Sequence, residues 1–319
     1  MTGLWLRRAV LAAACASAAV LSACGSSDIA SAITPNRFVV FGDGLSDLGQ
    51  TGTKYTVNDG TSDSIWTQKM VASFGKTLTT ASQGGLSFAQ GNARVTLKPD
   101  AAGNNATPTI QEQISRFQAQ GGSWSNNDIA LVNGGTSDII TQFMAYRANQ
   151  QTEAQLNANV RQAGKDLGVQ VRRLVQSGAK YVSVMGTYNL GKTPWAIAMK
   201  EEGRLGTLST SFNDALLVEI VDLGANVLYL DAAYQINLMV ASPGSFGMVD
   251  SSRVACTSLD TGAGIGTGTN QVNSALCTPS TIASGVNYTQ YMFADAVHLT
   301  PVAQRQLGDY AYNKLRGRW

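Results

Sequence analysis

The stretch Phe38-Val-Val-Phe-Gly-Asp-Gly-Leu-Ser-Asp-Leu-Gly49 decides the fold. Four apolar residues of strand length lead directly into a turn of Gly, Asp and Ser, which is typical of a buried strand that ends at a tight loop. Three more apolar runs have this length, at 129–132, 181–185 and 227–230. Helical patterns occupy the segments between and after them: 64–74, 109–120, 152–177, 208–223 and 301–315. Alternating strands and helices predict a three-layer α/β/α fold around a mostly parallel sheet, with the active site at the carboxyl ends of the strands.

The composition narrows the possible functions. The chain has 319 residues, 44% of them hydrophobic, with a net charge of +2 and a mean hydropathy of -0.03. These values exclude a disordered chain and a polytopic membrane protein. They also give no electrostatic attraction to phosphates, so we expect no nucleic-acid partner. The single histidine, His298, excludes a multi-histidine metal centre and is the only residue available for a histidine-dependent mechanism.

The N-terminal segment has the pattern of an export signal. Arg7 and Arg8 precede an apolar run over 9–21 that is too short for a membrane span of roughly 20 residues. The sequence Leu-Ser-Ala-Cys24 resembles the bacterial lipobox, which predicts a lipoprotein signal peptide over 1–23, a lipidated Cys24, a flexible tether over 24–36 and a domain over 37–319. The lipid would anchor the protein to a membrane. The residue after Cys24 is not Asp, which by resemblance to bacterial lipoproteins favours the outer membrane. An ordinary signal peptide and a secreted protein are the alternative.

Processing also determines which cysteines remain for the fold. Cys15 is removed with the signal and Cys24 carries the lipid, so Cys256 and Cys277 remain. In an oxidising cell envelope we expect these two to form a disulfide, which would hold the Gly- and Thr-rich loop over 261–270 in place. Two buried free thiols are the alternative.

The chemistry is concentrated in two places. Asp295 lies three residues before His298 in the segment Tyr291-Met-Phe-Ala-Asp-Ala-Val-His-Leu-Thr300. An Asp that orients an imidazole beside a nucleophile on a strand-to-helix turn is the logic of Ser-His-Asp acyl transfer. We therefore predict that His298 is the general base and acid, that Asp295 orients it, and that the turn after 38–41 completes the site.

The chain resembles the GDSL-type esterases and lipases of the SGNH hydrolase superfamily. Gly42-Asp-Gly-Leu-Ser-Asp-Leu-Gly49 is similar to the first block of the family, Gly-Asp-Ser-Leu-Ser-Asp-x-Gly, and Asp295 with His298 matches its last block, Asp-x-x-His. Further blocks follow in the family's order at 84–94, 135–138, 189–194, 212–213 and 242–247. The resemblance covers nearly all of 37–319. It implies a flavodoxin-like SGNH fold and hydrolysis of carboxylic esters, with a small-molecule ester, acyl or lipid substrate and without a cofactor or a metal.

The departures from the family are concentrated at the catalytic positions. By the resemblance, the nucleophile position, which normally carries Ser, is Gly44. The oxyanion donors correspond to Gly44, to Asn92 in place of a Gly, and to Ser137 in place of an Asn. A backbone N–H survives at Asn92, and a hydroxyl at Ser137 replaces an amide with a shorter reach. Gly44, in contrast, offers no nucleophile.

Three interpretations follow. First, the chain is a working hydrolase in which Ser46 replaces the nucleophile, or in which His298 activates a water molecule in the space beside Gly44. Second, the chain is an active esterase that carries an inactivating Ser-to-Gly change. Third, the chain is a non-catalytic pseudo-hydrolase of the envelope that binds an ester, an acyl chain or a glycan. The sequence does not choose among them.

Overall fold

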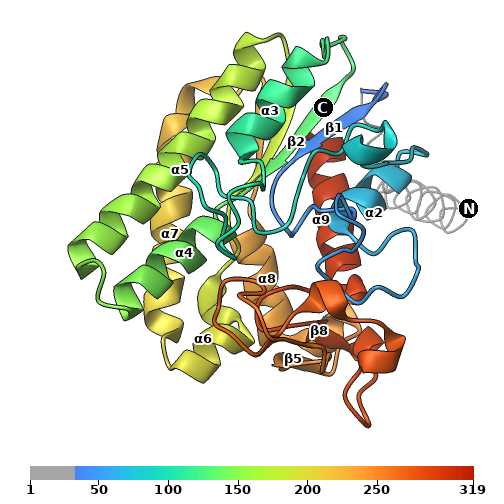
Figure 1. The fold of residues 1–319 in the computed structure, drawn as a ribbon. Coiled ribbons are helices and arrows are strands. Elements are labelled where there is room, and N and C mark those ends of the chain that lie inside the picture. The colour runs from blue at the N-terminus through green and yellow to red at the C-terminus, as the bar shows by residue number, and fades with distance from the viewer. Residues whose placement is uncertain (1–32) are drawn as a thin grey trace, which may run out of the picture.

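The computed structural model describes residues 33–319, and within them the predicted three-layer α/β/α architecture is present (Figure 1). The central sheet has four strands in the order β1-β2-β3-β4, and every neighbouring pair is parallel. Helices α5 and α7 pack together on one side of the sheet, and α2 and α9 pack together on the other (Figure 1). The four strands are β1 (Phe38–Phe41), β2 (Ile129–Asn133), β3 (Tyr181–Met185) and β4 (Val227–Leu230).

Three of the predicted helices begin at a recognisable start signal. A capping box from Thr109 begins α3, and another from Thr152 begins α5. Pro301 stands in the first turn of α9, where its missing N–H costs no hydrogen bond. The helices are α2 (Trp66–Ala72), α3 (Ile110–Ala119), α4 (Thr136–Arg147), α5 (Glu153–Gln176), α6 (Pro194–Met199), α7 (Glu202–Glu219), α8 (Ala232–Ala241) and α9 (Pro301–Arg318).

Some predicted elements differ from the structure. The helix predicted over 208–223 is α7, which begins six residues earlier and ends at Glu219, and the pattern did not predict α4, α6 or α8. Helix α4 begins after Gly135, which provides no side-chain cap and has a φ of 111°, so the usual start signal is missing. This helix matters for function, because its first turn lies at the carboxyl end of β2.

The edge of the sheet beside β1 carries one more extended segment. Ser87 forms a single parallel bridge with Val40, and the Phe88 amide donates to the Val40 carbonyl at 2.7 Å. A flavodoxin-like sheet has a full strand at this place. The bridge brings the segment over 84–94 alongside the end of β1, which places Asn92 close to Gly44.

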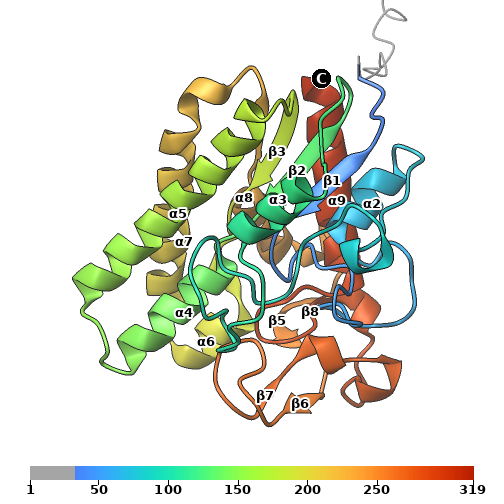
Figure 2. The same cartoon turned by 45° about the horizontal axis from the view of Figure 1, so that its top comes forward.

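The polypeptide between α8 and α9 forms a separate layer of loops and short strands at one end of the molecule (Figure 2). Its strands are β5 (Asp250–Val254), which pairs with β8 (Tyr291–Phe293), and β6 (Leu259–Asp260), which pairs with β7 (Gln271–Val272). Cys256 and Cys277 form the predicted disulfide across this layer. None of the helices in 33–319 is long and apolar enough to cross a membrane. The predicted signal peptide and Cys24 lie outside the described residues.

Candidate active site

The structure brings His298 and Asp295 into direct contact. The imidazole Nδ1 lies 2.9 Å from Asp295 Oδ2 and 3.1 Å from Oδ1. The same carboxylate accepts the backbone amides of Val297 at 2.8 Å and His298 at 2.6 Å, so the turn after β8 folds around it. A further amide, that of Ser274, donates to Oδ2 at 2.9 Å from a distant part of the chain. An Nδ1–H that donates to a carboxylate leaves Nε2 as the free acceptor on the other side of the ring.

The surroundings of Asp295 favour its charged form. The carboxylate is completely buried, and burial alone would raise its pKa. The charge and hydrogen bond of His298, together with the amides that donate to the carboxylate, outweigh the burial and lower the pKa of Asp295 to about 2. Asp295 is therefore ionised at neutral pH and suited to hold an imidazole in one tautomer and to stabilise an imidazolium.

The free Nε2 atom of His298 faces the backbone of Gly44. A Cβ atom built on Gly44 would lie 2.8 Å from Nε2 and 3.3 Å from Cδ2 of the ring. The backbone of Gly44 lies outside the left-handed region, so its conformation is open to a residue with a side chain. The imidazole thus points at the place where a side chain of residue 44 would start.

Three hydrogen-bond donors without protein acceptors meet at this place. Within 33–319, the structure gives no acceptor to the amides of Gly44 and Asn92 or to the hydroxyl of Ser137. All three residues line one cavity together with His298. The space open to the centre of a water-sized sphere in this cavity is about 10 Å³, enough for a water molecule but too small for a long acyl chain. Unpaired donors around a small cavity are the arrangement that stabilises an oxyanion.

Asn92 occupies a backbone conformation that few residues adopt. Its φ is 61°, in the left-handed region that Gly and Asn tolerate best. Its side-chain amide donates to the Gly264 carbonyl at 3.0 Å and to the Tyr55 hydroxyl at 3.2 Å. Asn92 thus keeps the backbone conformation that a Gly would adopt freely. Its side chain also links this segment to the segments of Tyr55 and Gly264.

Ser46, the alternative nucleophile, faces a different direction. It is completely buried, and its Oγ accepts the indole N–H of Trp66 at 2.9 Å. The structure gives no contact between Ser46 and His298 in the described chain, and Ser46 does not line the cavity. In this geometry Ser46 anchors the turn after β1 to helix α2.

The acidic residues of the first block also serve the turn. Asp47 accepts the amides of Gly49, Gln50 and Gly91, and it thereby ties the turn after β1 to the segment that carries Asn92. Burial raises the pKa of Asp47 to about 6 against these hydrogen bonds. Among residues 33–319, no group of three or more His, Cys, Asp or Glu side chains is placed to hold a metal ion.

A second buried acid supports the start of helix α4. Asp138 accepts the Arg94 guanidinium at 3.2 Å and the Val95 amide at 3.0 Å, which fastens the helix that carries Ser137 to the segment that carries Asn92. Burial raises the pKa of Asp138 to about 6, and the charge of Arg94 opposes that rise. Asp43, which is also buried, accepts the Asn133 amide at 2.6 Å at the end of β2, and burial raises its pKa as well.

Several residues of the site gave no signal in the sequence. The Tyr55 ring packs 4.9 Å from the His298 ring, centroid to centroid, and burial raises the pKa of its hydroxyl. Ile265, from the loop between the disulfide cysteines, closes one side of the cavity. Ser274 and Gly264 act through backbone groups, which any residue type can supply. None of these four belongs to a motif block, so only their position in space shows their contacts.

Comparison with known proteins identifies the family. The family model for GDSL-like Lipase/Acylhydrolase matches residues 38–311, which is most of the chain. The chain belongs to the GDSL-like lipase/acylhydrolase family. This finding agrees with the order of the motif blocks and with the α/β fold.

The similar curated proteins are distant and longer than this chain. An uncharacterized protein from the trpE-trpG intergenic region of Pseudomonas putida is 25% identical over 305 residues, which cover 88% of this chain and 48% of that protein. Esterase EstA of Pseudomonas aeruginosa is 28% identical over 141 residues, 44% of this chain and 20% of the esterase. GDSL esterase/lipase LTL1 of Arabidopsis thaliana is 30% identical over 192 residues, 56% of this chain and 49% of that protein. The chain thus aligns with half or less of each of these relatives.

Solved structures of esterases are similar only at low levels. Est24, a carbohydrate acetylesterase from Sinorhizobium meliloti, has a TM-score of 0.45 at 13% identity over 89% of this chain and 99% of that one. The inhibitor-bound aryl esterase of M. smegmatis has a TM-score of 0.43 at 14% identity over 89% of this chain and 99% of that one.

Proposed function

We propose that this protein is a carboxylic ester hydrolase of the bacterial cell envelope in which Gly44 at the nucleophile position impairs catalysis. The observation that carries this proposal is the direction of His298, whose Nε2 lies 2.8 Å from the place where a Cβ of residue 44 would stand. The base, its orienting Asp295 and three free donors are assembled around a position that lacks only the attacking atom.

The same residues support a slower reaction with water. His298 Nε2 takes a proton from a water molecule in the cavity, and the water oxygen attacks the ester carbonyl carbon. The amides of Gly44 and Asn92 and the hydroxyl of Ser137 stabilise the oxyanion that forms. When the intermediate collapses, the C–O bond to the alcohol breaks, and the leaving oxygen takes the proton from the imidazolium. The products are a carboxylic acid and an alcohol, and no acyl-enzyme forms.

The expected rate is low but above that of water. In hydrolases with a catalytic triad, loss of the nucleophile leaves about 10³–10⁴-fold catalysis over water from the rest of the site. The test is hydrolysis of p-nitrophenyl acetate by the native protein, by His298→Ala and by Asp295→Asn. We expect measurable turnover in the native protein and slower turnover in both variants, which keep the oxyanion donors but lose the base or its orientation. If His298→Ala is as active as the native protein, the assignment of the base is wrong.

The location in the envelope is a separate part of the proposal. It is supported by the lipobox-like sequence that ends at Cys24 and by the disulfide, because disulfides persist in oxidising compartments. Metabolic labelling with an alkyne fatty acid tests it in a bacterial host. Label on the native chain that disappears in Cys24→Ala supports a lipid anchor, and an unlabelled native chain contradicts it.

A non-catalytic binding protein is the second candidate, and Gly44 itself favours it. In that case a non-hydrolysable ketone or phosphonate analogue of a short ester binds at the cavity, while the native protein and His298→Ala hydrolyse esters at the same rate. The chemical shift of the single imidazole is a direct probe of such binding. Binding with no turnover above His298→Ala would replace the hydrolase proposal with this one.

A further inference from the structure

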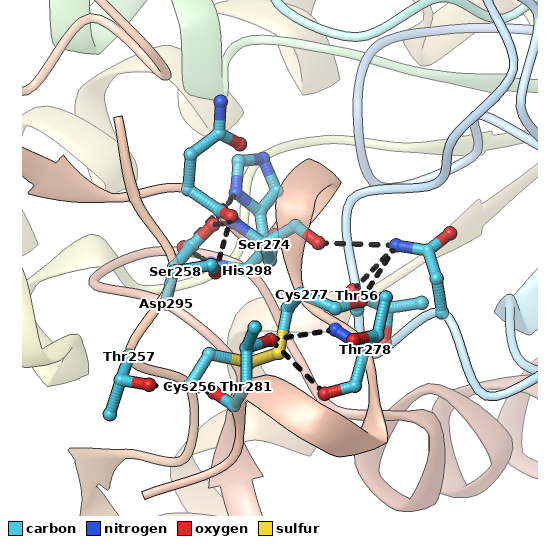
Figure 3. The surroundings of a disulfide bond; sticks show 12 residues. Thr56, Cys256, Thr257, Ser258, Ser274, Cys277, Thr278, Thr281, Asp295 and His298 are labelled. Carbon is cyan, nitrogen blue, oxygen red and sulfur yellow. Dashed lines mark hydrogen bonds and ion pairs between the residues drawn. A yellow bond between two sulfur atoms is a disulfide. The ribbon is translucent and has the colours of Figure 1, made fainter. Parts of the chain in front are cut away.

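The loop closed by the disulfide reaches into the active site from a distant part of the chain. The bridge joins Cys256 to Cys277, 21 residues apart. Figure 3 shows Ser274, near the end of this loop, next to Asp295 and His298. The Ser274 amide donates to Asp295 Oδ2 at 2.9 Å. The other donors to Asp295 in 33–319 all come from the 295–298 turn itself, so the Ser274 amide is the donor from outside this turn.

The loop has little regular structure of its own, and apart from the hydrogen bonds of Asn273 to Ser258 and Asp260 few contacts within it hold that amide in place. Its only strands within the described chain are β6 and β7, with two residues each. Gly264, Gly266 and Gly268 all have positive φ values, which are typical of a backbone with wide conformational freedom in the unbridged state. The disulfide is the covalent restraint at the end of the loop, three residues after Ser274.

The end of the loop is fixed on one side by Asn58 as well. The Asn58 amide donates to the Cys277 carbonyl at 2.8 Å, and its side chain donates to the carbonyls of Ser274 and Cys277, each at 3.2 Å. Ser274 is thus held between the bridge and Asn58, with its N–H directed at Asp295. The same loop provides the Gly264 carbonyl that accepts the Asn92 side chain.

We propose that the Cys256–Cys277 bridge is a positioning device for the catalytic pair, and that it acts through the Ser274 amide on Asp295 and so on the orientation of His298. This inference rests on the roles proposed above for His298 and Asp295. Opening the bridge releases the amide, and Asp295 then loses its donor from outside the 295–298 turn. The main core lies in the central sheet and its helices and takes only Ile265 from the loop, whereas the two cysteines belong to a separate small cluster with Val57 and Ala294, so the fold as a whole should survive.

The first experiment uses the native chain and needs no turnover. An imidazole Nδ1–H that donates to a carboxylate gives a downfield proton resonance in NMR, and with one histidine that resonance can come only from His298. We expect the resonance in the oxidised protein and its loss or upfield shift after reduction with tris(2-carboxyethyl)phosphine and in the Cys256→Ser/Cys277→Ser double variant, with unchanged far-UV circular dichroism. A resonance that survives reduction unchanged overturns the proposal. Unfolding of the whole domain on reduction also overturns it, because the bridge would then act on the fold and not on the site.

A matched pair of variants at Ser274 separates the amide from the loop. Ser274→Pro removes the N–H at the first position of a 3-10 turn, Ser274–Leu276, where proline is tolerated and the preceding residue is extended. Ser274→Ala keeps the N–H and removes a buried hydroxyl that has no hydrogen-bond partner in the described chain. We expect the His298 resonance to persist in Ser274→Ala and to be lost in Ser274→Pro. Equal effects of the two variants contradict the proposed role of the amide, and if Ser274→Pro does not fold, reduction decides alone.

A kinetic experiment adds a second readout. In a Gly44→Ser background, reduction or Ser274→Pro should lower kcat for p-nitrophenyl acetate by about 10- to 100-fold, the scale of a small misplacement of a catalytic group, with KM unchanged. Ser274→Ala should leave kcat unchanged, and an unchanged kcat after reduction contradicts the proposal. If Gly44→Ser has no activity while the His298 resonance depends on the bridge, the proposed function fails and the positioning role stands.

Discussion

Substitution of Gly44 by Ser should create a serine hydrolase from this chain. The backbone of Gly44 permits a side chain, and the new Cβ would start 2.8 Å from His298 Nε2 and 3.3 Å from the Tyr55 ring. Contacts below 3.0 Å do not persist, so the imidazole must move back by a few tenths of an ångström. It is the far end of a side chain, held by Asp295 at 2.9 and 3.1 Å, so this movement is feasible. The Oγ atom, one bond further, then lies within hydrogen-bond reach of Nε2.

The size of the gain follows from two opposing factors. Removal of the nucleophile from a complete triad costs about 10⁶ in kcat. The hydroxyl of Ser137 reaches less far than an amide, so it supplies only part of the about 10²–10³ that a full oxyanion donor contributes. We therefore expect Gly44→Ser to raise kcat for p-nitrophenyl acetate by about 10³–10⁴, and the additional change Ser137→Asn to raise it further.

The control for this prediction is Gly44→Ala. Alanine places the same Cβ against His298 without a hydroxyl, so it measures the steric effect alone. A fluorophosphonate probe, which labels activated serines, should modify Ser at position 44 and leave both Gly44 and Gly44→Ala proteins unlabelled there, as intact mass and peptide mapping would show. If a folded Gly44→Ser variant is no more active than Gly44→Ala and takes no label, the argument that the site lacks only its nucleophile is refuted.

Three further predictions concern the other residues. Ser46→Ala should keep the rate of ester hydrolysis within about twofold of that of the native protein. It should lower the thermal midpoint, because Ser46 accepts a buried hydrogen bond from Trp66. Loss of activity in a folded Ser46→Ala protein would favour Ser46 as the nucleophile. In the Gly44→Ser background, Ser137→Ala should lower kcat by about 10-fold or more. The thermal midpoint should stay unchanged, since the Ser137 hydroxyl has no hydrogen-bond partner in the described chain. An unchanged kcat would mean that Ser137 is not an oxyanion donor. The thermal midpoint should rise as the pH is lowered from 7 to 4. The buried carboxyls of Asp47 and Asp138 have pKa values raised to about 6, so their protonated forms stabilise the fold. This contribution is complete below pH 3.8 and is lost as the pH rises through 6. Below pH 4 the trend should reverse, because the pKa of Asp295 is lowered to about 2, and the stability that its charged form provides is present above pH 3.8 and lost as the pH falls through 2. A thermal midpoint that falls steadily from pH 7 to 4 would contradict the raised pKa values of Asp47 and Asp138.

The sequence predicted the parts of the molecule that depend on local pattern. The strands of the central sheet match the apolar runs: β1, β2 and β3 each have at least four consecutive buried residues, and β4 is buried at both ends. The contact between Asp295 and His298 followed from their spacing, and the disulfide followed from the number of cysteines that export leaves in the fold. Helix α4 was missed because Gly135 gives no capping signal.

The remaining features of the site depend on contacts between distant segments. The Ser274 amide and the Gly264 carbonyl are backbone groups, so their residue types contain no information about their partners. Tyr55 packs on His298 from a loop with no regular pattern. The position of His298 against Gly44 was expected only from the resemblance to the family, because an absent side chain leaves no local sequence signal for the space that it vacates.

The time course of p-nitrophenol release from p-nitrophenyl acetate by the native protein tests the central claim most directly. If His298 activates water beside Gly44, release is linear from the first turnover and has no initial burst. In His298→Ala it falls to the rate that the oxyanion donors support without a base. Gly44→Ser, in contrast, should give a burst whenever deacylation is slower than acylation. A burst equal to the amount of native protein would show a covalent intermediate on another residue. A rate equal to that of His298→Ala would show that His298 does not act as the base. Either result contradicts the account.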